Sequence, residues 1–229
     1  MPSDQCETAQ VIWRDRSIPV SLRFDDPYFS LAGGLAEKQH VFLHGNRLAE
    51  RFRPGFQIAE LGFGTGLNLL AACRLFAQTG QGGPVYFTSF EAFPMAAADM
   101  HQALAAFPDI APLADRLVSA WQQGLRRFQI GAVCVEVIEG NASTSLPNWQ
   151  GRADAWFLDG FSPAKNPDMW RPELLGAVAA HTKPGGTFAT YTAAGHVRKA
   201  LADVGFTVDR VPGFGRKRHM TTGVLKDRK

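Results

Sequence analysis

The sequence has little cysteine, and neither its cysteines nor its histidines form a pattern typical of metal ligands. The three cysteines, Cys6, Cys73 and Cys134, are far apart, and none belongs to a CxxC pair. This spacing argues against both a disulfide framework and a thiolate metal site. The six histidines show no HExxH spacing either. We therefore expect no metal, and three thiols without a ligand or redox role.

Long apolar runs are also missing. The most apolar helical stretch, residues 67–77, contains Arg74, whereas a membrane-spanning helix needs about 18 or more apolar residues in succession. The first ten residues, MPSDQCETAQ, lack the basic start and apolar core of a secretory signal. These absences predict a soluble, cytoplasmic protein with no membrane partner.

Charge is unevenly distributed along the chain, whose formal net charge is +3. The segment from Asp209 to the C-terminus holds seven basic and two acidic residues, so it carries +5 and the rest of the chain carries −2. A basic end favours a polyanionic partner, because each Lys or Arg at a phosphate releases counterions. A solvated tail would have the same composition, so both interpretations stay open at this point.

Short β-rich runs alternate with helical patterns along most of the chain, which predicts an α/β fold with a parallel sheet flanked by helices. We expect strands at 57–61, 85–91, 133–138, 154–159 and 187–192, and helices near 67–78, 95–107, 113–123, 172–181 and 196–204. Residues 126–130 should form a hairpin with 133–138, and residues 206–211 should form the last hairpin with 221–225. A terminal hairpin whose last strand inserts antiparallel is typical of class I S-adenosylmethionine (SAM) methyltransferases, by analogy between folds.

The 229 residues, 45% of them hydrophobic, are sufficient for one well-cored domain with an appendage. Before Pro54 the chain is rich in aromatic and turn residues and shows no helical period. We therefore divide the chain into an N-terminal extension, residues 1–53, packed on the core and β-rich, and a domain over residues 54–229.

A glycine-rich motif, Glu60-Leu-Gly62-Phe-Gly64-Thr65-Gly66, lies where the first strand of the domain should meet its helix. Glycines there allow positive φ and close approach of a ligand to the backbone. Leu67 stands where the third glycine of a dinucleotide fingerprint belongs, and no P-loop lysine follows. An acid two residues before the first glycine is the usual form in SAM methyltransferases, where it supports the methionine end of the cofactor. The motif predicts a cofactor site, although a Gly-rich turn also occurs for structural reasons alone.

Two acids are expected at the same edge of the sheet. Glu91 ends the second strand and can accept both ribose hydroxyls of an adenosine, unless it is merely a solvent-facing acid. Asp159 ends the strand 154–159 and should point into the crevice beyond the strand ends, near Gly62. A carboxylate at that position can hold or deprotonate an attacking amine. Asp159 could instead cap its loop or bind the amino group of the cofactor.

Long motifs give the chain a family resemblance. The segments DGFSPAKNPDMW (159–170), ELGFGTGLN (60–68), SFEAFP (89–94), TAAGHVR (192–198) and GFGRKRHM (213–220), together with FDDPYFS and VFLHGN, cover nearly its whole length. The chain thereby resembles the methyltransferase domain of the bacterial tRNA 5-methylaminomethyl-2-thiouridine biosynthesis family, in its bifunctional form MnmC and its single-domain form MnmD.

The resemblance implies transfer of a methyl group from SAM to the aminomethyl nitrogen of 5-aminomethyl-(2-thio)uridine at the tRNA wobble position. Many family members carry a second, FAD-dependent oxidase domain. This chain has no second Gly-rich nucleotide motif, so we expect no FAD domain here, and a separate oxidase would supply the amine. Two alternatives remain, a SAM-dependent N-methyltransferase for another acceptor and a non-catalytic RNA-binding protein with the same fold.

The resemblance also suggests roles for individual residues. Asp159 would orient and deprotonate the amine. The family commonly has Gly-Asp where this chain has Gly140-Asn141, so Asn141 would bind the adenine region through its amide oxygen. Phe161, Lys165 and Asn166 would form the rim where the uridine enters. Arg216, Lys217 and Arg218, at the tip of the last hairpin, would contact tRNA phosphates.

Overall fold

A computed structural model describes residues 6–30 and 33–226. Asp227, Arg228 and Lys229, which belong to the predicted basic end, lie outside the described residues, as do residues 1–5 and 31–32 of the predicted extension. No helix within the described residues is long and apolar enough to cross a membrane.

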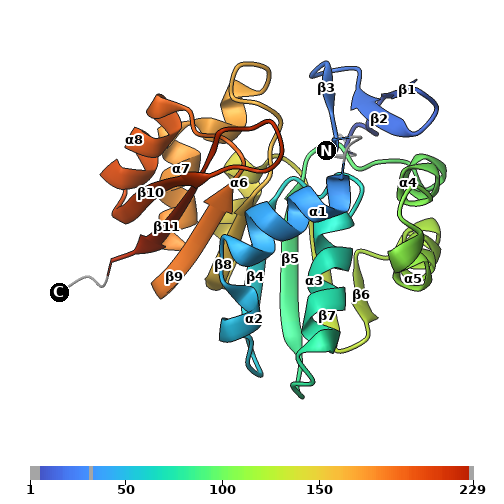
Figure 1. Ribbon diagram of the computed structural model, residues 1–229, viewed down its shortest axis with the longest axis horizontal. Helices are drawn as coiled ribbons and strands as arrows, with labels where there is room; N and C mark the ends of the chain where they lie inside the picture. The colour runs from blue at the N-terminus through green and yellow to red at the C-terminus, as the bar shows by residue number, and fades with distance from the viewer. Residues whose placement is uncertain (1–5, 31–32, 227–229) are drawn as a thin grey trace, which may run out of the picture.

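The core of the molecule is an eight-stranded sheet with the order β10-β11-β9-β8-β4-β5-β7-β6 (Figure 1). The central strands β4 (Gln57–Leu61), β5 (Val85–Glu91), β7 (Val133–Glu139), β8 (Ala153–Leu158) and β9 (Thr182–Thr190) pair in parallel. The edge strand β6 (Arg127–Ile130) pairs antiparallel with β7, as the predicted hairpin requires. The α/β prediction is confirmed.

The final hairpin is confirmed as well. Strand β11 (His219–Leu225) lies between β10 (Phe206–Pro212) and β9 and is antiparallel to both. The predicted bounds of β9 were wrong, because the strand runs from Thr182 to Thr190 and not over residues 187–192. The Pro184-Gly185-Gly186 turn is accommodated within β9 by an irregular register opposite Ala153 and Ala155.

Helices cover both faces of the sheet. One layer contains α3 (Leu67–Gln78), α4 (Ala97–Leu104) and α5 (Ala111–Gln122), and the other contains α6 (Ala142–Ser145), α7 (Pro172–Ala180) and α8 (Gly195–Asp203). Alternating side chains of β8 serve both layers: Phe157 packs in the core with α3, while Trp156 and Leu158 pack in the core with α7 and α8. This two-sided burial explains why β8 is apolar almost throughout.

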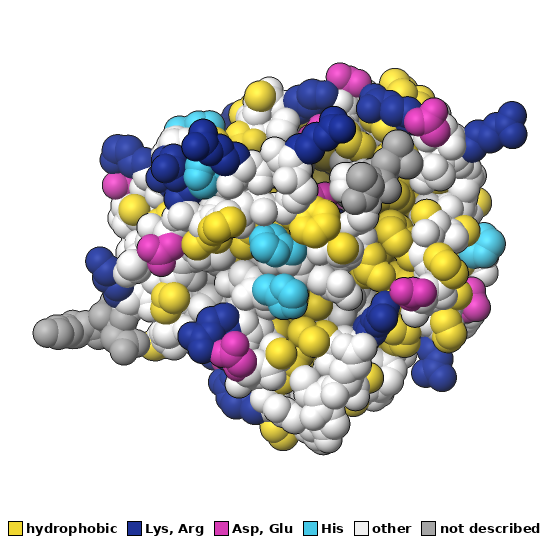
Figure 2. Space-filling view, in the orientation of Figure 1, with side chains coloured by type: hydrophobic (Ala, Val, Ile, Leu, Met, Phe, Trp, Pro, Cys, Tyr) yellow, Lys and Arg dark blue, Asp and Glu magenta, His cyan; other side chains and the backbone are white. Residues whose placement is uncertain are grey.

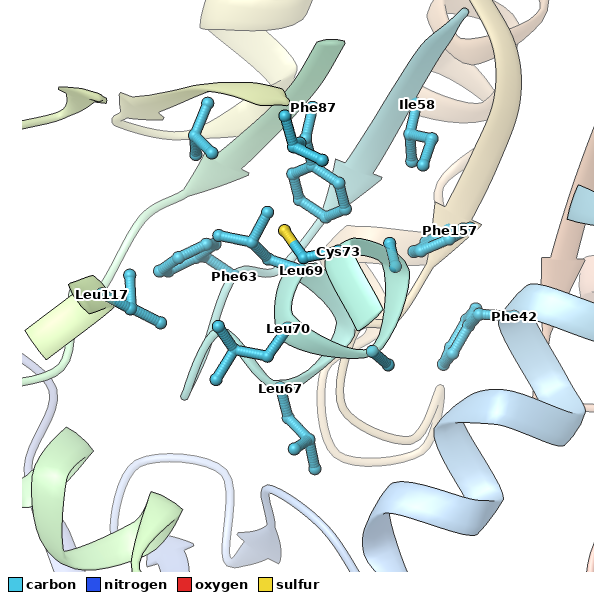
Figure 3. Close-up of a cluster of buried hydrophobic side chains, with 14 of the residues drawn as sticks. Phe42, Ile58, Phe63, Leu67, Leu69, Leu70, Cys73, Phe87, Leu117 and Phe157 are labelled. Carbon is cyan, nitrogen blue, oxygen red and sulfur yellow. The ribbon is translucent and has the colours of Figure 1, made fainter. Parts of the chain in front are cut away.

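Helix α3 lies at the centre of the hydrophobic core on the face of the sheet that α3, α4 and α5 cover (Figure 3). Leu69, Leu70 and Cys73 are buried, and Phe87 of β5 and Phe157 of β8 contribute to the same cluster. Because α3 starts directly after the glycine-rich turn, this packing fixes the turn against the carboxyl ends of β4 and β8.

The N-terminal extension is only partly β-structure. Strands β1 (Val11–Arg14), β2 (Ile18–Ser21) and β3 (Asp26–Pro27) form a small antiparallel sheet. The second half is helical, with α1 (Gly34–Lys38), a π-helical turn (Gln39–His44) and α2 (Leu48–Arg51). The expectation that this half lacks helix was wrong, because the wide π turn buries Val41, Phe42 and Leu43 in succession and hides the usual helical period.

Candidate active site

A cavity of about 1110 Å³ lies at the carboxyl ends of β4, β5 and β8, beneath the N-terminal extension. Of the predicted site residues, those that line it are Gly62, Gly64, Thr65, Glu91, Asn141, Asp159, Phe161, Lys165, Asn166 and Lys217. The structure thus brings together residues from nearly the whole chain. Glu60, Gly66, Arg216 and Arg218 do not line this cavity.

The glycines of the turn have different roles. Gly62 has φ +89°, and a Cβ there would lie 2.6 Å from the carbonyl oxygen of Asp159. Gly64 has φ +52°, and its missing side chain leaves room beside the ring of Tyr28. Gly66 has φ +75° and faces Leu117 of α5, so it serves packing at the start of α3. Of the three glycines, Gly62 and Gly64 line the cavity.

Glu91 is joined to the glycine-rich turn. Its carboxylate accepts hydrogen bonds from the backbone amides of Gly64, at 2.9 Å, and Phe93, at 2.8 Å. Burial raises the pKa of Glu91, although these two amides act in the opposite direction. The strand-end acid and the turn therefore form one unit at the cavity wall, as a two-point nucleoside site requires.

Glu60 is completely buried beneath the turn. It accepts hydrogen bonds from Asn68 Nδ2 at 2.8 Å and from Ser89 Oγ at 2.7 Å. Burial raises the pKa of Glu60 to about 8, and the nearby negative charge of Asp159 adds to this effect. Burial therefore favours the protonated form of Glu60, which lies behind the cavity wall.

Asn68 connects Glu60 to Asp159. Its Nδ2 also donates to Asp159 Oδ2 at 2.7 Å, so one amide group joins Glu60 to Asp159. Its Oδ1 is buried and has no hydrogen-bond partner among the described residues. An unpaired buried acceptor at a cavity wall is a place for a ligand donor.

Lys38 is a cavity-lining residue that the sequence did not predict. This lysine of α1 is 8% exposed, lines the cavity and forms an ion pair with Asp159. Its Nζ lies 5.4 Å from the ring centroid of Phe42. No local pattern marked Lys38, because 121 residues separate it from Asp159. Asn68 and Ser89 were also missed, although both belong to motifs that carried the resemblance.

Asn141 lies at the cavity, but its side chain already has a local role. Its Oδ1 accepts a hydrogen bond from the backbone amide of Ser143 at 2.9 Å and so caps α6. An amide oxygen has two lone pairs, so a second donor can still bind there. The adenine contact remains a prediction.

The loop after β8 meets the N-terminal extension over the cavity. The Phe161 ring lies 4.9 Å from that of Phe24 and 5.1 Å from that of Tyr28, between centroids. Lys165 binds the backbone oxygen and the carboxylate of Asp25. These contacts make the extension one wall of the cavity. Asn166, in the same loop, lines the cavity and precedes the 3₁₀ turn Pro167–Trp170.

The basic residues of the last hairpin separate into two groups. Lys217 is 48% exposed but reaches α1, where its Nζ binds Glu37 Oε1 at 2.7 Å and lies 4.4 Å from the ring centroid of Tyr191. Arg216 and Arg218 are exposed as well, and they do not line the cavity. Lys217 therefore links the hairpin to α1. The sequence had predicted only a contact with tRNA phosphates for this lysine, as for Arg216 and Arg218.

A comparison with protein families decides the identity. A family described as "S-adenosyl-L-methionine-dependent methyltransferase" matches residues 108–226, more than half of the chain. The chain belongs to this family. It is a SAM-dependent methyltransferase, and SAM is its cofactor.

Curated relatives extend the similarity. The "tRNA 5-methylaminomethyl-2-thiouridine biosynthesis bifunctional protein MnmC" of Pseudomonas aeruginosa (strain UCBPP-PA14) is 46% identical over 95% of this chain and 35% of its own length. The protein of the same name from Chromobacterium violaceum is 45% identical over 94% of this chain and 34% of its own length. The methyltransferase thus spans about a third of the length of these relatives.

A solved structure supports the fold. The crystal structure of MNMC2 from Aquifex aeolicus matches with a TM-score of 0.78 and 24% identity, covering 97% of this chain and 73% of that chain. At this identity the match shows a shared fold only.

The cavity of this methyltransferase fits SAM. Gly62 and Gly64 bring their backbone to the cavity wall, and the buried Oδ1 of Asn68, another cavity-lining residue, has no hydrogen-bond partner among the described residues. Glu91 lines the same cavity and is held to the turn by the Gly64 amide. The described residues contain no group of three or more His, Cys, Asp or Glu placed to hold a metal ion.

Proposed function

We propose that this methyltransferase transfers a methyl group from SAM to the aminomethyl nitrogen of 5-aminomethyl-(2-thio)uridine at the wobble position of tRNA. The observation that carries the proposal is the position of Asp159. Its carboxylate shares one cavity with the glycine-rich turn, under a wall that includes Phe24, Tyr28 and Phe161. The names of the MnmC relatives support the choice of substrate.

The cofactor-binding roles follow from the turn. Glu60, Gly62, Gly64, Thr65 and Gly66 hold or shape the methionine side, with Asn68 as a further contact, while Glu91 binds the ribose and Asn141 the adenine region. When bound, SAM supplies an electrophilic methyl group: the amine lone pair forms the N–C bond, the C–S pair stays on sulfur, and the product nitrogen carries an extra proton.

Asp159 then has two tasks for the substrate. It accepts a hydrogen bond from the amine and so aims the nitrogen lone pair, and it receives the proton that the product nitrogen must lose. Most of the acceleration comes from alignment, because the displacement needs nitrogen, carbon and sulfur in line. Phe161, Lys165 and Asn166 border the entrance for the uridine.

We propose that tRNA phosphates bind a basic surface at the hairpin end of the sheet. Arg210 and Arg218 lie close to His219, and together with Arg198 they assist burial in lowering the pKa of that histidine. Figure 2 shows Lys, Arg and His side chains gathered over the region that α8, β10 and β11 occupy in Figure 1. Arg216, in the connection between β10 and β11, is also exposed.

The remaining predictions stand as part of this proposal. Residues 1–53 form an extension that closes the cavity of the domain 54–229, the enzyme acts in the cytoplasm, and a separate FAD-dependent oxidase supplies the amine. The alternatives are another amine acceptor or RNA binding without catalysis.

Purified protein incubated with SAM and tRNA that carries aminomethyluridine tests the proposal. Nucleoside mass spectrometry should show one added methyl group on the wobble nucleoside, and cells that lack the gene should lack that nucleoside. A protein that binds SAM but methylates only small amines would favour the other acceptor. Binding of tRNA with no methyl transfer to any nucleoside would favour the non-catalytic alternative.

A further inference from the structure

The two carboxylate oxygens of Asp159 have different surroundings. Both protein donors, Lys38 Nζ and Asn68 Nδ2, bind Oδ2. None of the described residues donates a hydrogen bond to Oδ1, and Asp159 lines the cavity. One oxygen is therefore fixed by the protein, and the other is left to a ligand.

The positive charge of Lys38 also neutralises the negative charge of Asp159. Both partners are nearly buried, with side-chain exposures of 10% for Lys38 and 13% for Asp159, so solvent screens the pair weakly. An unbalanced carboxylate beside an amine would stabilise its ammonium form. An ammonium has no lone pair and cannot attack a methyl group. The lysine charge therefore opposes capture of the substrate in its unreactive form.

Other charged groups around the pair do not replace this effect. Burial favours the neutral form of Glu60, on β4, by raising its pKa. Tyr191, after β9, is also neutral, because burial and the negative charge of Asp159 raise its pKa. Glu37, on α1, is paired with Lys217 from the hairpin. Lys38 is thus the cation in direct contact with Asp159 among the described residues.

We infer that Lys38 is a positioning residue that holds Asp159 through Oδ2 and, by its charge, makes the site select the neutral amine of the substrate. This inference rests on the proposed function, because it needs an amine as acceptor. It assigns a role in substrate selection to α1, a part of the N-terminal extension.

The test uses the full chain and two variants of Lys38. Lys38→Met removes both the charge and the hydrogen bond, whereas Lys38→Gln removes the charge but keeps a donor. Single-turnover methylation of tRNA with aminomethyluridine, followed from pH 6 to 10, should show the rise in rate displaced upward by about 1 to 3 pH units in both variants. Lys38→Arg should restore the wild-type pH profile even if its maximal rate is lower.

Proton release gives a second readout that does not depend on turnover. An aliphatic amine is mostly protonated near neutral pH, so binding it as the neutral form releases a proton. Calorimetry with an anticodon stem–loop that carries aminomethyluridine, in the presence of S-adenosylhomocysteine and in two buffers of different ionisation enthalpy, measures this release. Wild type should release close to one proton at pH 7, and Lys38→Met and Lys38→Gln should release much less.

Lys183→Met is the matched control. Lys183 also pairs with a buried aspartate, Asp154, at 2.6 Å, and does not line the cavity. Its pH profile and proton release should match wild type. An unchanged profile and unchanged proton release in folded Lys38→Gln would overturn the inference while leaving the proposed function intact. Wild-type protein that neither binds nor methylates the aminomethyl substrate would overturn both.

Discussion

The backbone amide of Gly64 donates a hydrogen bond to Glu91 Oε2 at 2.9 Å, which joins the glycine-rich turn to the end of the neighbouring strand. The turn belongs to the β4–α3 connection and the acid to β5, 27 residues later. Parallel pairing of β4 with β5 places the two at the same edge of the sheet. The two predicted contacts to SAM, the turn and Glu91, are therefore coupled, and a substitution at one should alter the position of the other.

Replacing Gly64 with Val should abolish SAM binding and leave the fold largely intact. Gly64 has φ +52°, a region that costs an L-residue about 1 to 2 kcal/mol, and the added branched side chain would occupy space in the cavity beside Tyr28. Calorimetric titration with SAM checks this. Gly80→Val is the control, because Gly80 has a similar φ of +66° with nothing within 4 Å of an added Cβ. Equal SAM affinity in both folded variants would remove the turn from the site.

Replacing Asp159 with Asn should affect chemistry more than cofactor binding. We expect SAM affinity within a few-fold of wild type and a methylation rate lower by about 10² or more, the lower range for loss of a positioned base. Raising the pH should restore part of the rate, because solvent then deprotonates more of the amine. Rapid-quench methylation assays at several pH values measure this, and near wild-type turnover at neutral pH would contradict the role of Asp159 as a base.

Glu60 should make the folded protein less stable as pH rises. Its pKa is about 8 in the folded state against 4.5 for an ordinary glutamate, so the folded state binds more protons between these values. The free energy of unfolding therefore falls across this window, by on the order of a few kcal/mol. Glu60→Gln cannot titrate, so its stability relative to wild type should improve between pH 5 and pH 8.5.

Urea unfolding at both pH values measures this change. Asp154→Asn is the control, because hydrogen bonds and charge from Lys183 and Arg53 lower the pKa of Asp154 against the effect of burial. A carboxyl whose pKa is lowered by folding stabilises the folded state at every pH above its pKa in the unfolded state, and this stabilisation is lost only in acid. The loss of stability caused by Asp154→Asn should therefore be constant between pH 5 and pH 8.5. A constant difference for Glu60→Gln would show that Glu60 is ionised in the folded protein.

The basic surface should contribute to tRNA binding through individual phosphate contacts. Replacing Arg198, Arg210 and Arg218 with Ala should weaken binding and lower the slope of log affinity against log salt by about 2 to 3 units, at roughly 0.7 to 0.9 per lost contact. Lys217→Ala should change the slope little, because Lys217 is paired with Glu37.

Filter-binding titrations at several salt concentrations distinguish these variants. The matched control replaces three exposed arginines elsewhere, Arg116, Arg127 and Arg152, with Ala. An unchanged slope in the first triple variant would place tRNA on another face. SAM affinity should be the same in all of these proteins.

The order of the elements and the nature of the turn were determined by local sequence. The apolar pattern of 154–159, typical of a strand buried on both faces, predicted β8. Gly62, Gly64 and Glu91 could be predicted to lie together because the carboxyl ends of parallel strands meet at one edge of the sheet. The boundaries of β9 and the helical second half of the extension could not. A register irregularity and a π turn depend on what packs against them, here Ala153 and the core around α3.

The sequence by itself therefore determined the class of fold and the placement of the glycine-rich turn, Glu91 and Asp159 at one edge of the sheet, because each depends on residues close together in a motif or at a predictable strand end. Tertiary structure alone decided that Lys38 binds Asp159, that Asn68 joins it to Glu60, and that Lys217 binds Glu37. These contacts depend on how the extension folds over the sheet. A buried charge takes the partner that three-dimensional packing brings within reach, and the spacing of residues along the chain does not specify that partner.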